Sequence, residues 1–141
     1  MDPPSILIVE DEPDIAELLV HVMRDEGYQV QHAENGLIAL AMLLAAPVDL
    51  LLTDLTMPVM SGHQLIKAVA ENPDLKKIPI LVLSALPKDG MAVGKGSAVS
   101  GYMHKPFRVR QLTETVGSLL AQAMLHLLQY PSHAGRNRLR P

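Results

Sequence analysis

The chain of 141 residues contains no cysteine, no tryptophan and only one phenylalanine. Without cysteine, disulfides and thiolate chemistry are excluded. Because aromatic residues make up only 3% of the chain, the core must be built from aliphatic side chains and methionine. Charged residues are also sparse at 19%, whereas hydrophobic residues reach 48%. This balance indicates a well-buried globular protein rather than a disordered one.

Long apolar runs and a strong charge of one sign are missing as well. No run approaches the length of about 20 residues that a membrane-spanning helix needs. The N-terminus has no basic segment followed by an apolar stretch, so we expect no signal peptide and a cytoplasmic location. A net charge of −3 gives no reason to expect nucleic acid or an anionic membrane as a main partner. The length fits one domain.

Short apolar runs alternate with segments of helical periodicity along the chain. The expected strands cover residues 5–9, 28–33, 49–53, 78–83 and 102–103. The expected helices cover residues 13–26, 37–46, 62–71 and 108–129. Right-handed crossovers then predict a doubly wound α/β fold with a five-stranded parallel sheet in the order 2-1-3-4-5, as in flavodoxin-like folds.

Residues 87–100 are less regular than the rest of the chain. Pro87 could only open a helix, because it has no backbone donor for a helix interior. Gly90, Gly94 and Gly96 follow, and each glycine inside a helix costs about 1 kcal/mol relative to alanine. We therefore expect the fourth helix of the fold to be short, irregular or absent.

The strand over residues 49–53 is apolar on both faces and ends at Asp54. Such a strand belongs in the middle of a parallel sheet, and ligands bind beyond the carboxyl ends of these strands. Glu10 and Asp11 follow the first strand, Ser84 ends the fourth and Lys105 follows the fifth. Because these ends share one edge, the three carboxylates should converge and repel one another. A divalent cation relieves that repulsion, and an all-oxygen, partly solvated site favours Mg²⁺.

These residues resemble the receiver domain of two-component response regulators, related to the chemotaxis response regulator. The resemblance rests on four motifs, which are Glu10-Asp11 after Ile-Leu-Ile-Val, Asp54 within Leu-Thr-Asp-Leu-Thr-Met-Pro-Val-Met-Ser-Gly, Ser84-Ala85, and Tyr102 followed by Lys105-Pro106-Phe107. All of them occur in this order at strand ends, from about Ser5 to the first half of the last helix.

The resemblance implies roles for the acidic residues. Asp54 would be the phosphoacceptor that attacks a phosphohistidine on a sensor histidine kinase or a phosphotransfer protein. Asp11 and Asp54 would bind Mg²⁺ directly, together with the backbone carbonyl of Thr56. Glu10 would act in the outer shell through a metal-bound water.

It also implies roles for the basic and hydroxyl side chains. Lys105 would pair with the phosphoryl group or, before it arrives, with Asp54. Ser84 would move to hydrogen-bond a phosphoryl oxygen, and Tyr102 would turn inward as the second switch residue. The Lys105–Pro106 bond is cis in the family. The protein would thus be a signalling protein of a phosphorelay, catalysing only its own phosphorylation and dephosphorylation.

Two positions depart from the family pattern in a way that bears on the lifetime of the phosphoryl group. Thr56 and Leu86 stand where the family places side chains that orient or exclude the attacking water. Neither residue has a carboxylate or an amide, so we expect slow self-dephosphorylation.

Two other functions fit parts of the pattern. One is a receiver-like scaffold that is never phosphorylated, which the intact Asp54, Lys105 and Ser84 oppose. The other is a phosphohydrolase of the haloacid dehalogenase type. That class places its nucleophile after the first strand, with a second acid two residues later, whereas here the strand is the third and the later residue is Thr56.

We expect a receiver domain over residues 1–129, a flexible tail over residues 130–141 and no effector domain. Such a stand-alone receiver would signal by contact with a downstream protein target. The last helix continues beyond Ala121 with an apolar strip of Met124, Leu127 and Leu128, through which the chain could form a homodimer. Packing of that strip on the same domain is the alternative.

Overall fold

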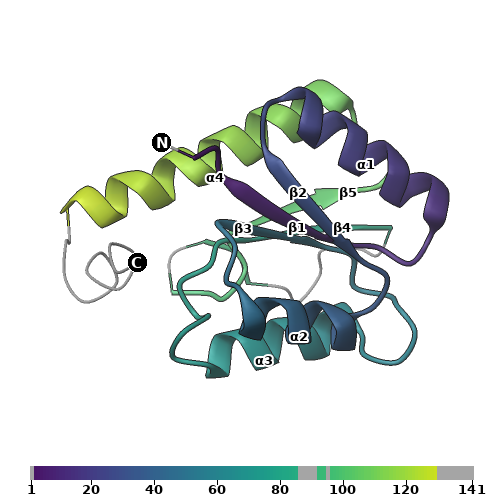
Figure 1. Ribbon diagram of the computed structural model, residues 1–141, viewed down its shortest axis with the longest axis horizontal. Coiled ribbons are helices and arrows are strands. Elements are labelled where there is room, and N and C mark those ends of the chain that lie inside the picture. Colours follow the sequence, from purple (N-terminus) through teal and green to yellow (C-terminus); the bar gives the residue numbers. More distant parts are fainter. Residues whose placement is uncertain (1, 86–91, 95, 130–141) are drawn as a thin grey trace.

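The computed structural model of the chain describes residues 2–85, 92–94 and 96–129 (Figure 1). Its strands are β1 (Ser5–Val9), β2 (Gln29–Ala33), β3 (Leu50–Thr53), β4 (Ile80–Ser84) and β5 (Gly101–His104). Its helices are α1 (Pro13–Asp25), α2 (Gly36–Ala45), α3 (Gly62–Glu71) and α4 (Val109–Gln129). Each expected element is present, with boundaries within two residues of the prediction.

The five strands form one parallel sheet in the order β2-β1-β3-β4-β5. This confirms the predicted fold class and strand order. Helices α2 and α3 cover one face of the sheet, and α1 and α4 cover the other (Figure 1). All five strands therefore present their carboxyl ends along the same edge.

The interior strands β1, β3 and β4 are buried on both faces, as expected for the middle of a parallel sheet. In β1, Ile6 and Ile8 pack toward α1 and α4, whereas Leu7 and Val9 pack toward α2 and α3. All four residues of β3 are likewise buried. The strand that precedes Asp54 is thus enclosed by apolar side chains on both sides, which fixes the position at which that carboxylate emerges.

Local signals fix the ends of the helices that border the carboxyl edge. Asn35 caps α2 through a bond from the Ile38 N–H to its side chain, at 2.9 Å. Ser61 and Gln64 form a reciprocal capping box at the start of α3. Pro13 occupies the first turn of α1, where its missing N–H costs nothing. These caps place three helix starts beside the strand ends.

No helix lies between β4 and β5 in residues 92–94 and 96–100, in agreement with the expected irregular fourth helix. Gly94 and Gly96 have positive φ angles of 100° and 87°, which glycine adopts at little cost. The Ser100 N–H bonds to the carbonyl of Ile80 at 2.8 Å and ties the segment to β4. Residues 86–91 and 95, including Leu86, Pro87 and Gly90, lie outside the described part of the chain.

Helix α4 is 21 residues long, but its buried side chains are confined to Leu112, Val116 and Leu119. Beyond these residues the helix runs past the sheet (Figure 1). Met124 and Leu128 there are 49% and 71% exposed, while Leu127 is half-buried. Among the helices that the structure describes, none is both long and apolar enough to cross a bilayer.

Candidate functional site

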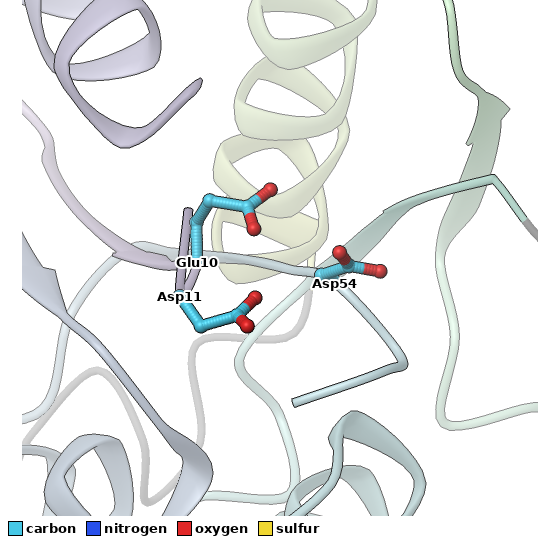
Figure 2. Close-up of side chains that lie close together, drawn as sticks. All are labelled: Glu10, Asp11 and Asp54. Carbon is cyan, nitrogen blue, oxygen red and sulfur yellow. The ribbon is translucent and has the colours of Figure 1, made fainter. Parts of the chain in front are cut away.

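Three carboxylates meet at the carboxyl edge of the central strands (Figure 2). Glu10 and Asp11 directly follow β1, and Asp54 directly follows β3, which is the neighbouring strand. Each of these three residues offers an oxygen within 4.8 Å of the others. The predicted convergence of the acids is therefore present in the structure.

The backbone on both sides of Asp54 is fixed by hydrogen bonds. Its N–H donates to the carbonyl of Val9 at 3.1 Å, which extends the β1–β3 ladder by one residue. Its carbonyl accepts from the hydroxyl of buried Thr53 at 2.8 Å. The carboxylate itself accepts from the backbone N–H of Leu55 at 2.6 Å. These bonds leave the side chain little freedom to turn away from the edge.

The first residue of α3 packs directly against the residue that carries this carboxylate. A Cβ on Gly62 would overlap the carbonyl oxygen of Asp54 and would lie 2.7 Å from the Cα of Leu55. Only glycine lets the helix begin this close to the end of β3. The approach is completed by a bond from the Gly62 N–H to the carbonyl of Leu55 at 2.9 Å.

Lys105 reaches the acidic cluster from the end of β5. Its Nζ donates to Oε1 of Glu10 at 2.7 Å and to Oδ2 of Asp54 at 3.0 Å. The lysine side chain is 15% exposed, and those of Glu10 and Asp54 are 2% and 11% exposed. One ammonium thus bridges two partly enclosed carboxylates. The Lys105–Pro106 peptide bond is cis, as the family resemblance implies.

Burial and pairing act in opposite directions on the ionisation of this cluster. Burial raises the pKa of Glu10, and the nearby charge of Asp54 adds to that effect, although the bond from Lys105 partly offsets it. Burial alone would lower the pKa of Lys105, but the bonds to Glu10 and Asp54 raise it above its ordinary value. The Lys105 ammonium therefore stays charged at neutral pH, whereas the Glu10 carboxyl is harder to ionise than one in water.

The remaining predicted site residues lie in β4, in β5 and just beyond Asp54. Ser84 is the buried last residue of β4, and β4 pairs with β3 so that Thr53 lies opposite Val82. Tyr102 lies in β5, half-buried, and packs against the apolar cluster beneath α2 and α3. Thr56 is exposed two residues beyond Asp54, with its N–H 3.4 Å from Oδ1 of that aspartate.

Three features of the site were not foreseen from the sequence. The bond from Lys105 to Glu10 joins residues 95 positions apart, and no local pattern announces it. The contact of Gly62 with Asp54 could have been suspected only from a glycine at a helix start. A third feature, the ring of His32, contacts the carbonyl of Glu10 at 2.8 Å and has no sequence signal of its own.

Chemically, the cluster combines hard oxygen ligands with one fixed ammonium. Carboxylate oxygens suit Mg²⁺, which commonly binds through one or two of them and keeps several waters. An ammonium beside a carboxylate can neutralise charge on the oxygens of a phosphoryl group. The donor set therefore fits a magnesium-dependent phosphoryl site.

Comparisons with known proteins match this geometry. Residues 6–117 fit the family model of the response regulator receiver domain. The chain is 34% identical over 117 residues to the chemotaxis protein CheY-3 of Vibrio cholerae, covering 82% of this chain and 90% of that protein. It is 42% identical over 121 residues to the sensor histidine kinase TmoS of Ectopseudomonas mendocina, covering 85% of this chain but 12% of the kinase.

Solved structures show the same fold at similar identity. The receiver domain of a signal transduction histidine kinase from Syntrophus aciditrophicus has a TM-score of 0.76 and 32% identity, with 84% of this chain and 91% of that one covered. The response regulator TrrA of Thermotoga maritima, solved in complex with Mg²⁺ and BeF, has a TM-score of 0.72 and 33% identity, with coverages of 82% and 98%.

The relatives differ in how much of their own length this chain spans. It spans most of the chemotaxis proteins, but 12% of the kinase TmoS and 61% of the probable transcriptional regulator ycf29 of Pyropia yezoensis. Receiver domains are signalling modules of two-component systems that work with histidine kinases or phosphotransfer proteins. From its fold, its edge of acids and its match over residues 6–117, the chain belongs to the response regulator receiver domain family.

Proposed function

We propose that the chain accepts a phosphoryl group on Asp54 from a phosphohistidine of a sensor histidine kinase or phosphotransfer protein. The observation that carries the proposal is the position of the Asp54 carboxylate, 3.0 Å from the Lys105 ammonium and within 4.8 Å of the oxygens of Glu10 and Asp11. A phosphoryl group attached there would meet a fixed positive charge and an acidic pair suited to a cation.

The transfer is a displacement at phosphorus. An oxygen of Asp54 forms a new P–O bond while the P–N bond of the phosphohistidine breaks, and the imidazole nitrogen keeps the electron pair. The bonds from Leu55 N–H and Lys105 Nζ hold the carboxylate in place for this attack. Afterwards the Lys105 ammonium would turn from the carboxylate to a phosphoryl oxygen, with the Ser84 hydroxyl as a further donor.

Mg²⁺ would be held by Asp11 and Asp54 with the backbone carbonyl of Thr56, and when bound it would neutralise charge on the phosphoryl oxygens. An outer-shell role for Glu10 is supported by its existing bonds. Its Oε1 accepts from Lys105 Nζ at 2.7 Å, and its Oε2 accepts from the Glu12 N–H at 3.3 Å. Asp11 is exposed and therefore accessible to a cation from solvent.

A shallow apolar groove beside Lys105 supports contact with a phosphodonor protein. It is lined by side chains from α1 and from the segment after β5, namely Ile15, Leu18, Lys105, Pro106, Phe107 and Val109. Leu18 and Val109 are each 45% exposed. An apolar surface this close to the phosphoacceptor would let a partner position its phosphohistidine while excluding water.

We further propose that signalling proceeds by protein contact after Ser84 and Tyr102 change position, and that the protein acts in the cytoplasm. The assignment of residues 1–129 to the receiver domain stays a prediction, and the expected tail lies outside the described residues. Membership in the receiver family decides against the haloacid dehalogenase-type alternative. An unphosphorylated scaffold remains as the second candidate.

The test is incubation with acetyl phosphate and Mg²⁺, followed by intact mass measurement. A gain of one phosphoryl group that is lost in Asp54→Asn supports the proposal. The matched control is Asp74→Asn, which changes an exposed aspartate in the connection between α3 and the amino end of β4. This substitution should leave phosphorylation intact. No gain under conditions in which the protein is folded would favour the scaffold.

Self-association through the end of α4 belongs to the same proposal. Residues 115–129 carry no aspartate, glutamate, lysine or arginine, so two copies would face each other there without like-charge repulsion. The exposure of Met124 and Leu128 disfavours packing of this strip on its own domain. Sedimentation of the full chain and of a chain truncated after Ala121 should show dimer only for the former.

A further inference from the structure

The backbone N–H and the backbone carbonyl of Glu10 both form hydrogen bonds with residues of the edge strand β2. Its N–H donates to the carbonyl of Ala33 at 3.1 Å. Its carbonyl oxygen lies 2.8 Å from Nε2 of His32. The paired register of β1 and β2 ends at Val9 and Ala33, so this carbonyl stands beyond the last backbone rung. The imidazole N–H of His32 therefore donates the hydrogen bond that a backbone N–H would donate if the β1–β2 ladder continued.

This bond determines the orientation of one peptide plane. Because the peptide unit is planar, a fixed carbonyl of Glu10 also fixes the N–H and Cα of Asp11. The side chain of Glu10 is independently held by Lys105 and by the Glu12 N–H, and it is buried. Asp11 is exposed, so packing gives its side chain little support. The position from which that side chain extends is therefore set mainly by the peptide plane between Glu10 and Asp11.

We infer that His32 is a positioning residue that holds the Asp11 carboxylate in place for the cation, acting through the carbonyl of Glu10. The inference rests on the proposed magnesium site. Outer-shell partners that orient a ligand typically account for 10–100-fold in metal affinity. Donation from Nε2 is available both to the neutral Nε2–H tautomer and to the imidazolium, so the contact does not require a charged ring.

The test compares two unbranched side chains of similar length, one that can donate a hydrogen bond and one that cannot. Calorimetric titration of the full chain with MgCl₂ should show affinity about 10-fold weaker for His32→Met, with His32→Gln close to the unsubstituted protein. The control is His21→Ala, which removes an exposed histidine that pairs with Asp25 on α1. Its affinity should not change.

A second, metal-free measurement separates failure of this inference from failure of the proposed site. The NMR order parameter of the Asp11 amide should fall from a rigid value toward that of a flexible segment in His32→Met, and should recover in His32→Gln. If the unsubstituted protein binds no Mg²⁺, the metal site is wrong and the order parameter alone decides the inference. Equal Mg²⁺ affinity in the Met and Gln variants, or an unchanged Asp11 order parameter in both, would overturn it.

Discussion

The first residue of α3, Gly62, packs against the backbone of Asp54 so closely that no side chain can be accommodated between them. This contact sets the distance between the helix start and the end of β3. It therefore couples the stability of the α/β packing to the position of the carboxylate.

Replacing Gly62 with alanine should destabilise the protein by about 1–3 kcal/mol, because the new Cβ must displace backbone rather than a flexible side chain. Urea unfolding measures the change. Gly117→Ala in α4 is the matched control, since its Cβ would meet only the Tyr28 hydroxyl at 3.9 Å. That substitution should stabilise the helix by up to about 1 kcal/mol. A neutral effect of Gly62→Ala would contradict the close contact.

The raised pKa of Glu10 predicts a pH dependence of stability. A carboxyl whose folded pKa lies above its unfolded value favours the folded state at low pH, and this contribution is lost as the pH rises through the folded pKa. We subtract the unfolding free energy of Glu10→Gln from that of the unsubstituted protein. This difference should fall as the pH rises above 4.5, the ordinary pKa of a glutamate, because the unfolded chain begins to ionise there before the folded protein does.

Urea titrations between pH 4 and pH 7, with a chelator present, check this. Adding Mg²⁺ at neutral pH should restore part of the difference, because the cation compensates the ionised acids. A difference that rises with pH in the chelated protein would show that pairing with Lys105 outweighs burial.

Val59 has a φ of 69°, in the left-handed region that β-branched residues rarely adopt, and its side chain is 75% exposed. Val59→Asn should stabilise the protein by about 1 kcal/mol, because asparagine tolerates this conformation and little burial is lost. Thermal or urea unfolding gives the measurement. Val59→Thr keeps the branch at Cβ and should bring no comparable gain.

Thr56 stands beside Asp54 without an amide or a carboxylate to orient water. The proposed phosphoryl group on Asp54 should therefore outlast the range of seconds when Mg²⁺ is present, and Thr56→Asn should shorten its lifetime. Loss of the phosphoryl group can be followed by intact mass after removal of the donor. A lifetime of only seconds in the unsubstituted protein would refute the proposal of slow dephosphorylation.

The described residues between β4 and β5 form turns, with no helical run of hydrogen bonds. Backbone amides of residues 92–94 and 96–98 should thus exchange with solvent faster than those in the interior of α3. Hydrogen exchange of the unmodified protein tests this. Strong protection throughout that segment would indicate a regular helix.

The sequence predicted the sheet and the acidic edge because both depend on patterns that are local. Apolar runs such as Leu50-Leu51-Leu52 mark buried strands, and parallel strands bring their ends together whatever their separation in sequence. The predicted boundaries of α3 agree with the structure, in which Ser61 and Gln64 cap the start of the helix.

Features that depend on contacts between residues distant in sequence could not be predicted from the sequence. The expected pairing of Lys105 with Asp54 is present at 3.0 Å, but no sequence pattern predicts the additional bond to Glu10 at 2.7 Å, because these residues are 95 positions apart. The positive φ of Val59, in the loop between β3 and α3, runs against the intrinsic preference of valine and has no local sequence signal. The contact of His32 depends on where β2 ends.

The three residues of the bridge from Lys105 to Glu10 and Asp54 are synthesised at different times. The two acids are made first, and the lysine that joins them directly follows the last strand of the sheet, 95 residues after Glu10. A chain growing from its N-terminus therefore lacks this ammonium until synthesis has passed the end of β5. The acidic edge therefore gains its ammonium only when the chain that forms β5 is also available to complete the sheet.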